Sequence, residues 1–366
     1  MVGRDVVAVG DFEYDGLPVG VIFGLGSAER ELAGVIDGLE LRRVLVIAAE
    51  SEEPLARRLV APFSDRVAVV FTDVRPHVPT DVAEAARATA ARSGADAVLS
   101  IGGGSTTGTA KAVALTTGLP IIAVPTTYAG SEVTPVWGLT ERDRKTTGRD
   151  RRVLPSVVVY DPGLTVSLPA GLSAVSGLNA VAHCVEAFWG PRANPISSLM
   201  AAEGIRALAA GLPGVVGDPG DLEARSGVLY GAWLAGTVFA TAGAGLHHKL
   251  CHVLGGAYDL PHAEMHAVIL PHATALITSS LPEVDARVSL ALGAPLGTPA
   301  ATALAALVRR LGAPTALREV GLPEHELAAA ARLVVEQVPD RSPGDIEALL
   351  SAAWRGDMPM ALVSAT

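Results

Sequence analysis

Short apolar runs recur through the first half of the chain, and longer mixed segments separate them. This alternation is typical of parallel strands that are buried on both faces and connected by helices. We predict strands at residues 44–48, 67–71, 97–101, 121–124 and 157–160. We predict helices at residues 53–59, 80–93 and 106–117, and a further strand with its glycine turn at residues 21–27, before another helix.

The pattern changes after residue 160, where Ala- and Leu-rich segments with helical spacing replace the strands. The helices predicted there are residues 173–189, 195–210, 221–242, 247–254, 299–311 and 345–353. Thr298 before Pro299 predicts an N-cap followed by a first-turn proline. We therefore expect a Rossmann-like α/β nucleotide-binding domain at residues 1–165, an all-α substrate and catalytic domain at residues 166–366, and an active site in the cleft between them.

One uncharged segment, residues 227–246, is long enough to cross a bilayer. It is dense in Gly, Ala and Thr, and Arg225 is the only basic residue that flanks it on the N-terminal side. We therefore predict a buried central helix, and no contact with a membrane.

Composition narrows the possible functions. The net charge of -10 argues against binding of nucleic acid, because a polyanion requires a basic surface. Cys184 and Cys251 form no CxxC spacing, and the N-terminus has acidic residues and no long apolar stretch. We expect a cytoplasmic enzyme with reduced thiols.

Two loops after predicted strands carry the residues that nucleotide phosphates require. Gly102, Gly103, Gly104 and Ser105 follow one strand and begin a helix, so backbone N–H groups can approach a pyrophosphate closely. The segment matches neither GxGxxG nor a GK[ST] loop, and a plain strand-to-helix turn would look similar. The next strand ends in a loop that supplies further candidates, Thr126, Thr127 and Ser131.

Glu50 ends another predicted strand and could accept hydrogen bonds from the ribose of NAD. It could equally be a solvated residue at the start of a helix.

Seven of the nine histidines lie between positions 183 and 272. His248 and His252 are four residues apart, as are His262 and His266, and Asn179 precedes His183 by the same spacing. A lone histidine on an apolar helix is usually a core residue, but three such pairs point to a functional site.

The order Asn179-xxx-His183, His248-xxx-His252 and His262 resembles the iron-containing alcohol dehydrogenases, which have a dehydroquinate synthase-like fold. In that family an Asp, a His four residues later, and two further His fourteen residues apart hold a divalent metal. The segments GGGSTTG, PTTYAGSEVTPVWGLT, KTTGRD, SGLNAVAHCVEA and LPHAEMHAVILPH resemble the maleylacetate reductases more closely, over nearly the whole chain. This resemblance implies NADH- or NADPH-dependent reduction of maleylacetate, a dicarboxylate, to 3-oxoadipate in the degradation of aromatic compounds, by a homodimer.

Asn179 is the main departure from the metal-binding pattern. Its amide oxygen is neutral, so three His and one Asn would hold Fe or Zn weakly. We therefore expect no catalytic metal. If one binds, its ligands would be Asn179, His183, His248 and His262.

In a metal-free site, imidazoles must stabilise the enolate and supply its proton. We assign His248 and His252 as the acid or electrostatic groups, with His183 and His262 lining the same pocket. The substrate-binding candidates are Asn179, Lys145, Lys249, Tyr128 and Met265. Lys145 could anchor a carboxylate or could be an exposed hairpin residue, and we expect Lys111 to be a charge on a helix surface.

Three alternatives remain open from the sequence. A metal-dependent alcohol or aldehyde oxidoreductase on the same fold would require Asp in place of Asn179. A lyase or cyclase similar to dehydroquinate synthase would share the fold, but KTTGRD and LYGAWLAG look unlike that group. A non-catalytic nucleotide-binding scaffold would leave the clustered histidines unexplained. Met265 also makes a related enone acid a possible substrate.

Overall fold

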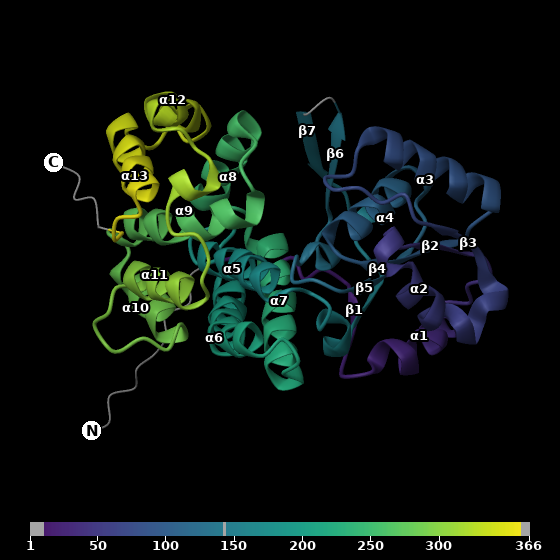
Figure 1. The fold of residues 1–366 in the computed structure, drawn as a ribbon. Coiled ribbons are helices and arrows are strands. Elements are labelled where there is room, and N and C mark those ends of the chain that lie inside the picture. The colour runs from purple at the N-terminus through teal and green to yellow at the C-terminus, as the bar shows by residue number, and fades with distance from the viewer. Residues whose placement is uncertain (1–10, 142–143, 360–366) are drawn as a thin grey trace, which may run out of the picture.

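The computed structural model describes residues 11–141 and 144–359, apart from the side chains of residues 144 and 145. Two lobes lie side by side, an α/β domain formed by the first half of the chain and a helical domain formed by the second (Figure 1). The strands are β1 Gly20–Phe23, β2 Val44–Ile47, β3 Val67–Phe71, β4 Ala97–Gly102, β5 Ile121–Pro125, β6 Val136–Glu141, β7 Arg144–Arg149 and β8 Val157–Tyr160.

Six of these strands form one parallel sheet in the order β1-β8-β5-β4-β2-β3. Helices cover both of its faces, which explains why every residue of the central strands β2, β4 and β5 is buried. Helices α1 (Ser27–Gly38) and α2 (Glu53–Val60) pack on one face, and α3 (Thr80–Ser93) and α4 (Gly104–Thr117) pack on the other (Figure 1).

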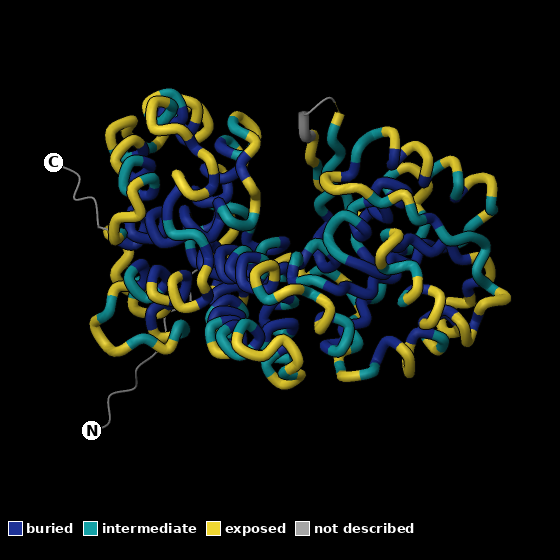
Figure 2. Tube along the Cα trace, in the orientation of Figure 1, coloured by how far each residue is buried: buried dark blue, intermediate teal, exposed yellow. Residues whose placement is uncertain are grey.

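The helical domain surrounds the central helix α5, Ala170–Glu186, which packs against α6, α7 and α9. Its remaining helices are α6 Pro195–Gly217, α7 Leu222–Ala242, α8 Leu246–Tyr258, α9 His262–Thr278, α10 Pro282–Ala291, α11 Ala300–Arg310, α12 Leu327–Gln337 and α13 Pro343–Arg355. The most deeply buried stretches of chain follow α5 and the sheet (Figure 2). Helix α9 contributes to two apolar clusters, one around α5 and one beneath α12 and α13.

Helix α7 joins the two domains. A Cβ atom at Gly130, in the loop after β5, would lie 2.9 Å from the Cα of Gly236 on α7, so the two backbones can touch only through glycine. The fully buried Arg225 donates to the hydroxyls of Tyr128 and Ser173 at 3.0 Å each. The loop after β5 is therefore fixed against the helical domain.

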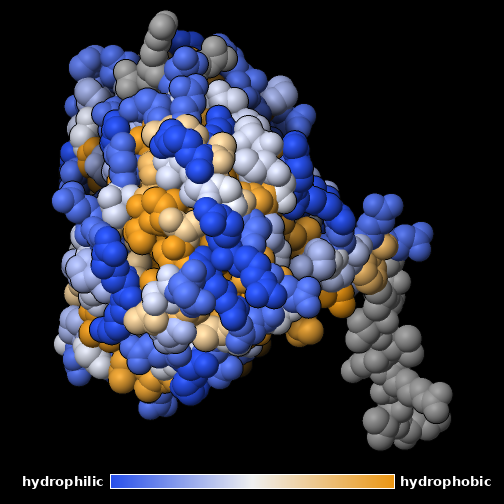
Figure 3. Space-filling view, turned by 90° about the vertical axis from the view of Figure 1, so that its right-hand side faces the viewer, coloured by the Kyte–Doolittle hydropathy of each residue, from blue (hydrophilic) through white to orange (hydrophobic). Residues whose placement is uncertain are grey.

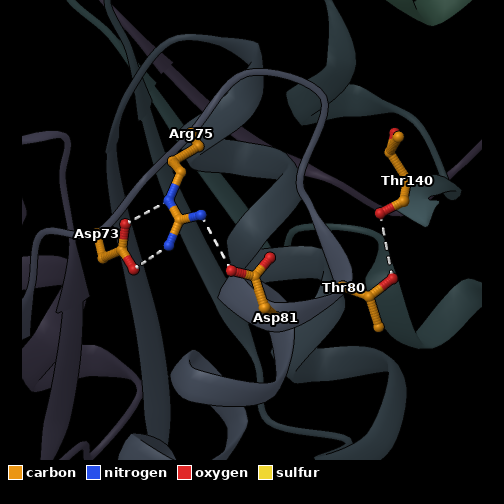
Figure 4. Close-up of polar contacts among 5 residues, drawn as sticks. All are labelled: Asp73, Arg75, Thr80, Asp81 and Thr140. Carbon is orange, nitrogen blue, oxygen red and sulfur yellow. Dashed lines mark hydrogen bonds and ion pairs between the residues drawn. The ribbon is translucent and has the colours of Figure 1, made fainter. Parts of the chain in front are cut away.

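A two-stranded hairpin, β6–β7, extends from the α/β domain toward the helical domain (Figure 1). The Thr80 hydroxyl, at the start of α3, donates to the carbonyl of Thr140 on β6 at 3.2 Å (Figure 4). Beside this contact, Arg75 bridges Asp73 and Asp81 (Figure 4). The Thr80 bond ties β6, close to the turn of the hairpin, to the start of α3, and the Arg75 bonds brace the segment that leads into α3.

Both domains mix apolar and hydrophilic residues on their surfaces, and Figure 3 shows an apolar area framed by hydrophilic residues at the α/β end of the molecule. By length and composition alone, α6 could cross a bilayer, and so could α7 and α8 together, although they meet at 96°. Both α6 and α7 pack against α5 inside the helical domain. The uncharged segment thus forms a buried helix, as predicted.

The structure confirms the predicted strands and the fold class, with element ends shifted by a few residues. The predicted cap at Thr298 is wrong, because Pro299 itself occupies the N-cap position and no side chain caps α11. The Thr298 carbonyl instead accepts a hydrogen bond from the Ser289 hydroxyl at 2.6 Å. Helix α6 also continues past Pro213, beyond its predicted end.

Candidate active site

Two loops meet at the carboxyl ends of the neighbouring strands β4 and β5, where ligands bind in open α/β sheets. The Thr126 N–H donates to the Gly102 carbonyl at 3.2 Å, which joins the loops. A Cβ atom at Gly103 would lie 2.9 Å from the Cγ2 of Thr127. Gly103, Gly104 and Ser105 are partly exposed at the N-terminus of α4, where free N–H groups favour an anion.

The acidic residue that reaches these loops is Glu52, and sequence analysis selected Glu50 instead. Glu50 is exposed at the start of a short 3-10 turn, Glu50–Glu52. The Thr126 hydroxyl donates to Glu52 Oε1 at 2.6 Å. A Cβ atom at Gly102 would lie 2.2 Å from Glu52 Oε2, so glycine is required for this approach.

Lys111 is buried, and the expectation of a charge on the helix surface is wrong. Its Nζ donates to the carbonyls of Ser131, Thr134 and Val136 at 2.6, 2.7 and 2.8 Å. Burial lowers the pKa of Lys111 to about 7, and the nearby Glu132 opposes that shift. Lys111 therefore holds the loop that begins with Ser131 in place.

The histidines predicted to line one pocket form a chain of neighbouring rings. His183 stacks on His248 with centroids 4.8 Å apart, and His248 lies 6.3 Å from His252. His252 in turn stacks on His262 at 6.4 Å. His183 and His248 are buried, whereas His252 and His262 are exposed. The chain of rings therefore runs from the core of the helical domain to its surface.

Two further contacts place this chain of rings near the hairpin. Phe239, at the end of α7, stacks on His183 with centroids 4.6 Å apart. The next residue, Ala240, accepts a hydrogen bond from Arg149 of β7 at 2.7 Å through its carbonyl. The hairpin that carries Lys145 is thus bonded to α7 beside the buried end of the histidine chain.

Glu186 is a site residue that sequence analysis missed. It is buried, its Oε2 accepts a hydrogen bond from His248 Nδ1, and its Oε1 accepts from the His247 backbone N–H at 2.6 Å. A Cβ atom at Gly245 would lie 2.7 Å from Oε1, so the start of α8 requires glycine there. Glu186 follows Asn179 and His183 by seven and three residues, a spacing that places all three on one helical face.

Burial controls the charge of three histidines in this region. It lowers the pKa of His183, His247 and His266 well below the usual range, and neighbouring imidazoles lower it further. These rings are therefore neutral near pH 7. Seven buried side-chain polar atoms have no hydrogen-bond partner among the described residues, and they include Asn179 Oδ1, His183 Nδ1 and His248 Nε2.

The family's metal position can be tested against these donors. Asn179, His183, His248 and His262 supply only neutral atoms, so this set would hold a dication less tightly than one that contains an Asp carboxylate. Within residues 11–141 and 144–359, one group of His, Cys or acidic side chains brings its ligand atoms within 4.8 Å. That group is His247, Cys251 and His266, and it includes none of the expected four ligands. The described residues thus fit a catalytic metal poorly.

The substrate candidates fall in different places. Lys249 and His252 line a cavity of about 440 Å³ between α8 and α12. Tyr128 and Met265 are fully buried, so neither can touch a substrate in this conformation. The Tyr128 hydroxyl bonds Arg225 and Thr165, and Met265 packs in the apolar cluster beneath α12. Lys145 lies on β7, and its side chain is outside the described part of the chain.

Known proteins match both domains. The profile of the family described as "Iron-containing alcohol dehydrogenase" matches residues 18–162, and that of "Fe-containing alcohol dehydrogenase family, C-terminal" matches residues 173–353. A maleylacetate reductase from Sphingobium indicum is 51% identical over 326 residues, which are 88% of this chain and 91% of that protein.

Solved structures match equally far along the chain. A maleylacetate reductase from Rhizobium sp. superposes with a TM-score of 0.91 at 45% identity, over 95% of this chain and 99% of that one. A sulfoacetaldehyde reductase from Bifidobacterium kashiwanohense, solved in complex with NAD+, superposes with a TM-score of 0.84 at 25% identity, over 94% and 99% of the two chains. The chain therefore belongs to the iron-containing alcohol dehydrogenase family, among its maleylacetate reductases.

Proposed function

We propose that this protein reduces the C=C bond of maleylacetate with NADH or NADPH to form 3-oxoadipate. The observation that carries this proposal is the His248 ring, which Glu186 holds at Nδ1 while Nε2 has no hydrogen-bond partner within the part of the chain that the structure describes. The sequence identity to maleylacetate reductases extends over nearly the whole chain and supports maleylacetate as the substrate. The related reductase solved with NAD+ supports a nicotinamide cofactor.

The chemistry requires a proton donor beside an electron-rich oxygen. Hydride addition to the alkene carbon β to the ketone moves an electron pair toward the ketone oxygen and forms an enolate. The enolate must then gain one proton on carbon, so each turnover consumes one NAD(P)H and one proton. Because Glu186 accepts from Nδ1, Nε2 is the nitrogen through which a doubly protonated His248 ring would donate a hydrogen bond or a proton to the substrate. The neutral His183 and the exposed His252 neighbour His248 and complete the polar lining of the proposed site.

Two lysines, Lys249 and Lys145, are our candidates for binding the two carboxylates of the substrate. Lys249 is the one cation among the described residues that line the cavity between α8 and α12, and His252 shares that cavity. Glu336 of α12 lines the opposite side of the cavity. Its negative charge would repel a substrate carboxylate from that side. We assign Lys249 to one substrate carboxylate and Lys145 of the hairpin to the other.

NAD(P)H oxidation with freshly prepared maleylacetate tests the function. We expect turnover that is equal with and without EDTA, because the donor set contains no anionic metal ligand. Simple aldehydes serve as control substrates and should give no oxidation. Absence of turnover with maleylacetate would refute the substrate, and chelator-sensitive activity that Fe or Zn restores would refute the metal-free mechanism.

We also propose a homodimer that works in the cytoplasm. The resemblance to maleylacetate reductases motivates the dimer, and the dependence on NADH or NADPH motivates the compartment. Light scattering coupled to size-exclusion chromatography measures the mass in solution. A monomeric mass at micromolar concentration would contradict the dimer.

A further inference from the structure

The cofactor loops have a carboxylate beside them that the family resemblance did not assign. In an open α/β sheet, the pyrophosphate lies at the helix after one strand, and an acidic residue after the neighbouring strand accepts the ribose hydroxyls. Here the glycine loop follows β4, and β2 is the strand that pairs with β4 on the side away from β5. The first residues after β2 are Ala48 and Ala49, so the nearest carboxylates come from the turn Glu50–Glu52.

Glu52 alone in that turn is directed at the loops. It is half-buried, and the Thr126 hydroxyl donates to its Oε1. Its Oε2 lies against Gly102 and has no hydrogen-bond donor among the described residues. Burial raises the pKa of Glu52, while the Thr126 hydrogen bond lowers it, so this carboxylate gains from a second donor. A sugar hydroxyl would be such a donor.

No cation offsets this carboxylate within the described residues. The two arginines of α2 pair elsewhere: Arg57 bonds Glu53, and Arg58 bonds Glu29. An anion placed over Glu52 would therefore meet an uncompensated negative charge. The 2′-phosphate that distinguishes NADPH from NADH is such an anion, and like charges placed together across an interface oppose binding.

We propose that Glu52 selects the cofactor: its carboxylate accepts the adenosine ribose hydroxyls of NADH and excludes the 2′-phosphate of NADPH. The inference rests on the nicotinamide dependence of the proposed function and deepens it. It does not depend on maleylacetate, because the contacts involve only the adenosine end of the cofactor.

Dissociation constants of NADH and NADPH test the proposal, measured by fluorescence on the intact protein without substrate. We expect NADH to bind about tenfold more tightly than NADPH or better. In Glu52→Gln the ratio of the two constants should fall toward one, mainly through tighter NADPH binding. Glu52→Asp keeps the charge and should keep the preference for NADH.

Two matched variants locate the effect. Glu53→Gln removes the same charge one residue away, from a carboxylate paired with Arg57, and should leave the ratio within about twofold of the parent protein. An unchanged ratio in Glu52→Gln would overturn the proposal, and so would a ratio that collapses in Glu50→Gln instead. Loss of both affinities in a folded Glu52→Gln protein would also overturn it, by assigning Glu52 to the shape of the loop. Failure to reduce maleylacetate with the ratio preserved would refute only the substrate.

Discussion

Glu186 shows how one buried carboxylate can define the chemistry of a ring beside it. Because it accepts from the Nδ1 of His248, the other ring nitrogen must carry out any exchange with a ligand. The same carboxylate accepts the first free N–H of α8 at His247, so it also fixes the start of the helix that carries both rings. Substitution of a residue that orients a functional histidine typically lowers activity about 10–100-fold.

Glu186→Gln tests this positioning role. The amide NH2 cannot accept a proton from Nδ1, so the ring should carry its proton at Nε2 and lose the orientation that Glu186 imposes. We expect kcat to fall about 10–100-fold, with little change in the KM for NADH. Imidazole ¹⁵N shifts would report the change of tautomer, which a purely structural role would not produce.

Glu326→Gln is the matched control for that substitution. Glu326 also accepts a hydrogen bond, from the Tyr258 hydroxyl at 3.3 Å, but it lies on a surface turn. Its kinetics should equal those of the parent protein. A fully active Glu186→Gln enzyme would remove Glu186 from the mechanism.

Helix α7 controls how closely the helical domain approaches the cofactor loops. Its contact with the loop after β5 has no room for a side chain: a Cβ atom at Gly236 would lie 2.5 Å from the Gly130 carbonyl oxygen. Elsewhere on the same helix, Gly227 has its nearest such neighbour at 4.0 Å. One helix thus offers a crowded and an open glycine.

Gly236→Ala should destabilise the protein by about 1–3 kcal/mol, because backbone must move to admit the methyl group. It should also weaken NADH binding, since the displaced loop contains Thr126 and Thr127. Gly227→Ala should be neutral or stabilising by up to about 1 kcal/mol, as alanine favours the helix. Urea unfolding of the parent protein and the two variants measures both changes in stability. Equal losses of stability in the two variants would refute the tight contact at Gly236.

Sequence reasoning succeeded where a pattern had one physical cause. The strand at residues 67–71 and the helix at residues 80–93 have the predicted ends, because continuous apolar runs and helical spacing reflect burial directly. It missed α9, which continues through Pro271, a residue type that usually ends or kinks a helix. It also missed Glu52 and Glu186, whose roles depend on partners 74 and 62 residues away. Burial of Lys111 likewise depends on a distant loop.

The molecule as a whole buries several imidazoles in neutral form, and this makes its stability depend on pH. Burial lowers the pKa of His272 to about 4, although Asp357 opposes the shift. An unfolded histidine binds a proton below about pH 6.5, so between pH 6.5 and 4 the unfolded chain holds more protons than the folded one. Stability therefore falls as pH falls through this window. His183, His247 and His266 act in the same direction.

His272→Asn should reduce this loss. From the shift of its pKa, His272 contributes on the order of 3 kcal/mol to the fall in stability between about pH 7 and pH 4. Urea unfolding at about pH 7 and pH 4.5 should therefore show a smaller difference in the variant than in the parent protein. His325→Asn, at a side chain that is 80% exposed, should change nothing. Equal pH dependence in all three proteins would contradict the shift.

The position of the edge strand β1 affects the order in which the sheet assembles during synthesis. Within the described residues β1 pairs only with β8, joining Gly20 to Val157 and Phe23 to Tyr160. During synthesis at about 5–20 residues per second, the first strand to leave the ribosome waits on the order of ten seconds for its partner. Until then β2, β3, β4 and β5 can assemble without it. Strand β1, which is synthesised before the other strands of the sheet, is thus the last to join them, and it closes the sheet only when the helical domain begins to emerge.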